Sequence, residues 1–73
     1  MKIHYDPEVD ALYIRFIDGP VEVTTHRLTE DVAVNFASDQ RVVGIEVLDA
    51  SSYLRRADHV PTVQLENLRG EAA

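Results

Sequence analysis

The sequence has no cysteine among its 73 residues, so disulfides, thiolate metal sites and thiol redox chemistry are excluded. It also lacks any apolar run near the roughly 20 residues that a membrane span needs. Residues 1–8 do not contain the apolar segment of a signal peptide. We therefore expect a cytoplasmic protein without membrane contact, folded as one small domain whose stability is marginal unless a partner adds to it.

Basic residues are few: 7 Lys and Arg stand against 13 Asp and Glu, which gives a net charge of −6. Nucleic-acid binding depends on a basic surface. The nearest candidate is the pair Arg55-Arg56, which lies beside Asp58 and is typical of a solvated helix end. The composition therefore predicts no nucleic-acid partner, whereas it is compatible with a basic protein partner or with solubility alone.

Motifs of metal, phosphate and nucleophile chemistry are also missing. The sequence has no glycine-rich phosphate loop and no G-x-S-x-G, and the histidines at positions 4, 26 and 59 lack the spacing of a zinc site. The turn from Asp6 to Asp10 carries three alternate carboxylates, but not the central glycine and distal glutamate of a calcium loop. We expect turn chemistry here, no metal, no cofactor and no catalytic residue.

The clearest feature present is a β-hairpin. Residues 32–36 and 42–48 alternate between apolar and polar around a loop at 38–41. The predicted facing pairs are Phe36–Val43, Val34–Ile45 and Val32–Val47 on one side, and Asn35–Gly44 and Ala33–Glu46 on the other. A slip of one residue would turn every large apolar side chain over, so the pattern specifies this register strongly.

Two further strands precede this hairpin. Residues 1–5 and 11–17 pair if Tyr5 faces Leu12 and Ile3 faces Ile14, which keeps their apolar sides together. The sequence D-G-P at residues 18–20 is typical of a tight turn, so it predicts a third strand directly after it, from Val21 to His26 or Leu28. In that register Arg15 faces Glu22.

After Leu48 the pattern becomes helical. Asp49 is a suitable N-cap, and apolar residues recur at helical spacing from Ala50 to Ala57 before Pro61 bars continuation. The predicted fold is α+β: an antiparallel β-meander of about five strands with one short C-terminal helix, within residues 1–60. Residues 61–73 form a tail that is either an edge strand or a docking segment.

The predicted sheet has more apolar surface than its helix can cover. About five strands at ~4.8 Å spacing make a sheet roughly 20 Å wide, whereas a helix is only about 10 Å across. Either the sheet curls into a half-barrel or a second chain completes the core. We therefore expect a homo-oligomer or an obligate protein partner.

Two segments resemble a known family. Y-D-P-E-V-D-A-L-Y-I at residues 5–14 and R-V-V-G-I-E-V-L-D-A-S at residues 41–51 resemble the YuzE-like family of very small bacterial and archaeal domains of unknown function. This chain has Asp39-Gln40 in the loop where that family usually has Asp-Gly. The resemblance implies a mainly β fold with a terminal helix and no established activity. Some relatives are encoded beside small toxin-like proteins, which implies an antitoxin-like role.

One polar patch is the candidate site. Gly44 leaves space in the middle of a strand for close approach of a backbone or a ligand, and the patch consists of Asn35, Gly44, Glu46, Asp49 and Tyr13. The leading functional prediction is a non-catalytic, antitoxin-like protein-interaction module that binds a second copy or a small basic protein. The alternative is a small homo-oligomeric enzyme or ligand-binding protein with its site at the subunit interface near Glu46 and Asp49.

Overall fold

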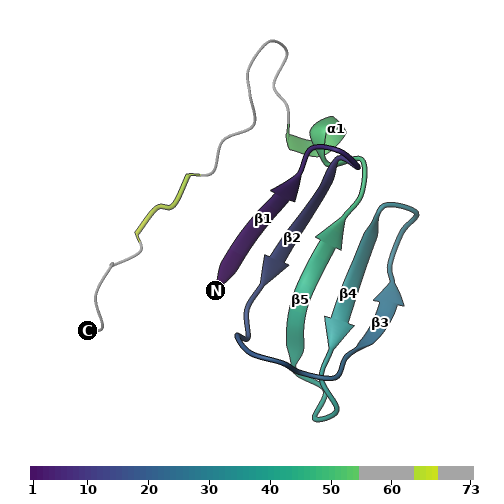
Figure 1. The fold of residues 1–73 in the computed structure, drawn as a ribbon, viewed down its shortest axis with the longest axis vertical. Coiled ribbons are helices and arrows are strands. Elements are labelled where there is room, and N and C mark those ends of the chain that lie inside the picture. Colours follow the sequence, from purple (N-terminus) through teal and green to yellow (C-terminus); the bar gives the residue numbers. More distant parts are fainter. Residues whose placement is uncertain (55–63, 68–73) are drawn as a thin grey trace.

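The computed structural model describes residues 1–54 and 64–67, and five strands of this part of the chain form one antiparallel sheet (Figure 1). The elements in chain order are β1 (Lys2–Asp6), β2 (Ala11–Arg15), β3 (Thr24–Arg27), β4 (Val32–Phe36), β5 (Val42–Val47) and α1 (Ala50–Leu54). The predicted α+β class, with a five-stranded antiparallel sheet and a short helix near the C-terminus, is confirmed.

The order of the strands differs from the predicted meander. Neighbours in the sheet run β1-β2-β5-β4-β3, so β2 pairs with β5 and not with β3. Residues 16–23 cross from β2 to the far edge of the sheet, where β3 begins (Figure 1). Three hairpin-connected strands and one long connection give the connectivity of a Greek key. The meander was wrong at this one connection.

Pairing with β5 explains the error. Gly19 has a φ of 87°, but residues 18–20 do not form the predicted tight turn. The backbone N–H groups of Phe16 and Ile17 donate instead to the carbonyl oxygen of Val43, over 2.7 and 3.4 Å. The chain beyond β2 therefore continues its pairing with β5, and β3 begins only at residue 24.

The predicted pair of Arg15 with Glu22 was wrong for the same reason. Arg15 lies opposite Gly44 of β5. Its guanidinium donates from Nε to the carbonyl oxygen of Ile17 over 2.7 Å and from Nη2 to that of Gly19. The side chain thus holds the beginning of the crossover in place.

The two predicted hairpins are confirmed, with one local change. Tyr5 faces Leu12, and in the second hairpin Val34 faces Ile45 as predicted. At the end of β4, however, a β-bulge shifts the register, so Phe36 lies opposite Val42 and not Val43. A bulge places two residues of one strand against one of its partner and increases the twist.

The start of α1 is held by a residue from another part of the chain. Asp49 was predicted as the N-cap, but the Asp10 carboxylate accepts the hydrogen bond from the Ser51 N–H at 3.1 Å. The Asp10 carbonyl oxygen accepts that of Ala50 at 3.0 Å. Figure 1 shows α1 beyond the end of the sheet, beside the turn between β1 and β2. The helix therefore sits at the end of the sheet and does not cover it.

Three sequence predictions fall wholly or partly outside the described residues. They are the extension of the helix to Ala57, the domain boundary at residue 60 and the conformation of residues 61–73. Of that tail the structure describes residues 64–67, which form neither strand nor helix.

Alternation along the strands divides the sheet into two faces of different chemistry. The apolar face consists of Ile3, Tyr5, Leu12, Ile14, Thr24, His26, Val32, Val34, Phe36, Val43, Ile45 and Val47. The polar face consists of Lys2, His4, Asp6, Ala11, Tyr13, Arg15, Thr25, Arg27, Ala33, Asn35, Gly44 and Glu46. All charged residues of the strands therefore lie on the polar face.

The described residues place no second layer over the apolar face. Val34 and Val43 are buried, but Ile3 and Tyr5 at its β1 edge are 39% and 40% exposed. Its remaining large apolar side chains are half-buried, and no large side chain in the described part of the chain is fully enclosed. The expected mismatch between sheet and cover is thus present in the structure.

Candidate functional site

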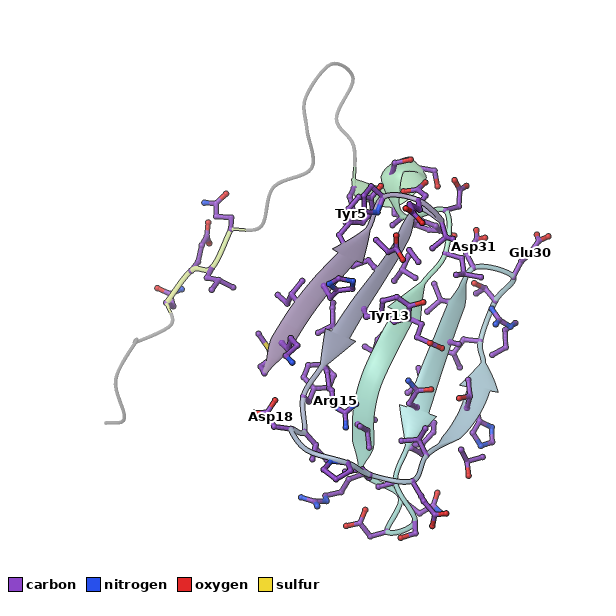
Figure 2. The ribbon with its side chains drawn as sticks, viewed as in Figure 1. Tyr5, Tyr13, Arg15, Asp18, Glu30 and Asp31 are labelled. Carbon is purple, nitrogen blue, oxygen red and sulfur yellow. The ribbon has the colours of Figure 1, made fainter. Side chains whose placement is uncertain are left out.

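A hollow of about 280 Å³ lies on the polar face, between the sheet and the crossover. It is lined from the sheet by Tyr13, Arg15, Asn35, Gly44 and Glu46, with neighbouring Ile14, Val43 and Ile45, and from the crossover by Val21 and Val23. In Figure 2 Tyr13 and Arg15 lie along β2, Arg15 nearer the crossover. The hollow therefore combines charged and hydrogen-bonding side chains with apolar lining residues.

Gly44 opens this hollow and also sets the contact between two strands. Its position lies between Arg15 on β2 and Asn35 on β4, where a side chain would fill the space between them. A Cβ atom built on Gly44 would lie 2.7 Å from the backbone carbonyl oxygen of Ile14. A close approach of a backbone or a ligand was predicted at Gly44, and the structure shows that the backbone of the neighbouring strand β2 makes this approach.

Four of the five predicted site residues come together here. Tyr13, Asn35, Gly44 and Glu46 all line the hollow, whereas Asp49 does not. Asp49 lies at the turn into α1 with a φ of 52°, and its carbonyl oxygen accepts the N–H of Ser52 at 3.1 Å. Asp49 therefore does not share the hollow with Glu46, because it lies after the end of β5, at the turn into α1.

Six lining residues were missed by sequence reasoning, and Arg15, Val21 and Val23 are the ones that differ most from their predicted positions. Arg15 was assigned to a pair with Glu22, and Val21 and Val23 were assigned to a strand beside β2. They belong to the site because the crossover passes over the polar face. No local signal marked them, because proline is tolerated as the first residue of a strand and the pairing of β2 with β5 joins segments far apart in the sequence.

Two opposite charges border the hollow without meeting each other. Arg15 and Glu46 are both half-buried, and no ion pair joins them. The guanidinium of Arg15 is occupied in part by two backbone carbonyls. Among the described residues, the Glu46 carboxylate makes no hydrogen bond or ion pair.

The neutral polar groups of the hollow are differently engaged. The Tyr13 ring stacks on His4 with 6.3 Å between the ring centroids, and the side chain is 36% exposed. The Asn35 Oδ1 atom accepts a hydrogen bond from the Thr25 hydroxyl at 2.7 Å. That bond orients the Asn35 amide, while the Tyr13 hydroxyl has no partner among the described residues.

A second polar cluster lies at the end of the sheet near α1. Asp10 accepts hydrogen bonds from the Tyr5 hydroxyl at 2.6 Å and the Ser51 hydroxyl at 2.8 Å. These contacts join the first hairpin to the helix. They explain the cluster as a structural cap, so it carries no separate functional assignment.

Tyr53 of α1 is tied to the loop between β3 and β4. Its hydroxyl donates to the Asp31 carboxylate at 2.8 Å. That hydrogen bond, with smaller effects of burial and of the charges on Asp31, Asp49 and Glu30, raises the pKa of Tyr53 above its ordinary value. Figure 2 shows Asp31 and Glu30 together at this end of the molecule.

The acidic turn before β2 is organised by the backbone. The Asp6 carboxylate accepts the N–H of Glu8 at 3.0 Å, as in an Asx turn, and Asp10 adopts a φ of 53°. Across residues 1–54 and 64–67, no three His, Cys, Asp or Glu side chains are grouped so that they could hold a metal ion. Within the same ranges no helix has the length and hydropathy to cross a membrane.

Comparison with known proteins places most of the chain in a family. The model of a family described as protein of unknown function (DUF2283) matches residues 2–51. No curated protein and no solved structure matches the chain. The expected membership of a group of small domains of unknown function is confirmed, whereas the YuzE-like name stays a prediction.

Proposed function

Since the chain belongs to the family of proteins of unknown function DUF2283, we propose its function from its own surface. We propose that it is a non-catalytic protein-interaction module whose apolar face binds a second copy of the chain. The observation that carries this proposal is the open apolar face of the sheet, which no described element covers. Exposed apolar surface of this kind marks interaction sites.

The distribution of charge supports a second copy as the partner. The chain has a net charge of −6, so two copies repel each other wherever their charged surfaces meet. The apolar face carries no Asp, Glu, Lys or Arg, because alternation places all charged strand residues on the other side. It is the surface on which identical chains associate with the least repulsion.

Sheet geometry supports the same arrangement. Two twisted sheets pack face to face with their strands within about 30° of each other and their side chains interdigitating. A twofold axis through the apolar face brings each edge of one sheet over the other copy. The half-buried side chains of β2, β4 and β5 would then form the centre of a two-layer core.

Sedimentation equilibrium over a concentration series of the full chain tests the proposal. We expect a dimer for the native sequence and a shift to monomer for the double variant Ile3→Lys, His26→Lys, which places charge at both edges of the apolar face. Both native side chains are exposed, so the fold tolerates the change. Lys2→Gln, on the polar face of β1, is the matched control and leaves the dimer intact.

A native chain that is monomeric at all concentrations contradicts the proposal. The hypothesis of an antitoxin-like role predicts a different experimental result. If native expression yields a stable one-to-one complex with a small basic protein, and the chain alone does not dimerise, the acidic surface is the binding surface instead. Co-purification followed by mass determination separates these two results.

A further inference from the structure

The hollow on the polar face carries an inference that is independent of the dimer. Its lining residues come from three strands and the crossover, and they combine charged, amide and phenol groups with apolar side chains. A volume of about 280 Å³ exceeds that of a few waters and matches a small organic molecule.

The two charges of the hollow define what such a molecule must carry. Tyr13 faces Glu46 and Arg15 faces Gly44, so Arg15 and Glu46 are diagonal neighbours across β2 and β5. Diagonal positions have Cβ atoms about 7–8 Å apart, which leaves room for one small group between them. A ligand with a cationic and an anionic end would pair with both residues, and neither forms an ion pair with another described residue.

The positions of the other lining groups would orient such a molecule in the hollow. Arg15 is held by the carbonyl oxygens of Ile17 and Gly19, so its guanidinium is positioned before any ligand arrives. Positioned donors lose less conformational entropy on binding. Val21 and Val23 line the crossover side and offer contact to an aliphatic group.

We propose that this hollow binds a small zwitterion of the α-amino acid class with an aliphatic side chain. The ammonium group pairs with Glu46, the carboxylate pairs with Arg15, and the aliphatic side chain packs on Val21 and Val23. Asn35 and Tyr13 border the same space and supply further hydrogen bonds.

Nuclear magnetic resonance titration of the ¹⁵N-labelled full chain tests the proposal with three matched probes. L-leucine carries both charges, 3-methylbutylamine lacks the carboxylate, and 4-methylpentanoate lacks the ammonium. We expect L-leucine to shift the amide signals of Asn35, Gly44 and Glu46 saturably, with a Kd of about 1 mM. Each single-charge probe binds about tenfold or more weakly, because it loses one charge-assisted hydrogen bond.

One variant and a matched control test whether L-leucine binds in the hollow. Glu46→Gln keeps the shape of the side chain and weakens L-leucine about tenfold, whereas Glu8→Gln makes the same charge change in a turn outside the hollow and leaves the affinity unchanged. Unchanged spectra of folded protein up to about 50 mM L-leucine would overturn the proposal. So would equal affinity for 3-methylbutylamine, or an unchanged affinity for L-leucine in Glu46→Gln.

Discussion

At the scale of single residues, left-handed backbone positions show where the chain makes its tightest turns. Four non-glycine residues in the described part of the chain have positive φ, namely Asp10, Gln40, Asp49 and Asn67. Asp and Asn tolerate this conformation because their short polar side chains bond locally. Gln40 has no such advantage. Its φ of 72° lies in the hairpin loop, where its N–H donates to the Ala37 carbonyl oxygen at 2.9 Å.

Gln40 therefore offers a stabilising substitution. Gln40→Gly relieves the left-handed strain and should raise the free energy of unfolding by about 0.5–1 kcal/mol. Urea denaturation measures this as a higher midpoint with an unchanged slope. The control is Ser38→Gly in the same loop, where φ is not positive and glycine brings only added chain entropy in the unfolded state. Equal effects of the two substitutions would contradict the strain argument.

At the scale of elements, the pairing of β2 with β5 is the contact that the fold depends on. It brings Arg15, Tyr13 and Glu46 to one hollow and sends the crossover over the polar face. Gly44 lies within this pairing, and its missing Cβ leaves room for the carbonyl oxygen of Ile14. The glycine therefore has a structural role as well as a place in the site.

Gly44→Ala should destabilise the protein by about 1–3 kcal/mol, because the new Cβ would lie 2.7 Å from a backbone atom and the strands must separate. Thermal or urea unfolding measures the loss. Val42→Ala on the same strand is the control, since Val42 is 37% exposed and its truncation costs less than about 1 kcal/mol. A neutral Gly44→Ala would mean that β2 and β5 tolerate a wider spacing.

The link between α1 and the β3–β4 loop depends on pH. Hydrogen bonding to Asp31 raises the pKa of Tyr53, so the protonated phenol is favoured in the folded state. The stability from this link is complete below the unfolded value of about 10 and is lost as pH rises through the higher folded pKa. Absorbance titration, with Tyr53→Phe identifying the contribution of Tyr53, should show it ionising above its ordinary range.

Two substitutions separate the causes of this shift. Asp31→Asn removes the acceptor charge and should return the pKa of Tyr53 most of the way to its ordinary value. Glu30→Gln removes only a weaker charge effect and should change the pKa less. Equal shifts in both variants would show that overall negative charge, and not the hydrogen bond, sets the pKa.

At the scale of the whole molecule, the separation of chemistry between the two faces is the dominant property. One face carries the charge and the hollow, and the other presents open apolar surface. The net charge of −6 doubles in a dimer, so charge repulsion opposes an association that burial of the apolar face favours.

Salt should therefore strengthen self-association. Raising ionic strength from about 0.01 to 0.15 M shortens the screening length from roughly 30 to 8 Å and weakens repulsion between the two acidic copies. We expect the dimer dissociation constant to fall, as measured by sedimentation equilibrium at each salt concentration. Binding of a basic protein partner would weaken under the same change, because attraction between opposite charges is screened.

The sequence alone determined the two hairpins and the division into faces. Alternation places Val34 opposite Ile45 and Tyr5 opposite Leu12, since a slip of one residue would expose every large apolar side chain. Local pattern also placed Asn35, Gly44 and Glu46 on one face, which is why sequence reasoning could group these three lining residues.

Only the tertiary structure decided which hairpin lies beside which. The sequence at residues 18–20 predicts a tight turn, but the chain continues its pairing with β5 at Phe16 and Ile17 and forms no turn there. Asp10 likewise caps α1 from 41 positions away, a contact that no local spacing encodes. Pairings between distant segments depend on which competing partner wins in three dimensions, so Arg15, Val21 and Val23 entered the site only when the sheet was assembled.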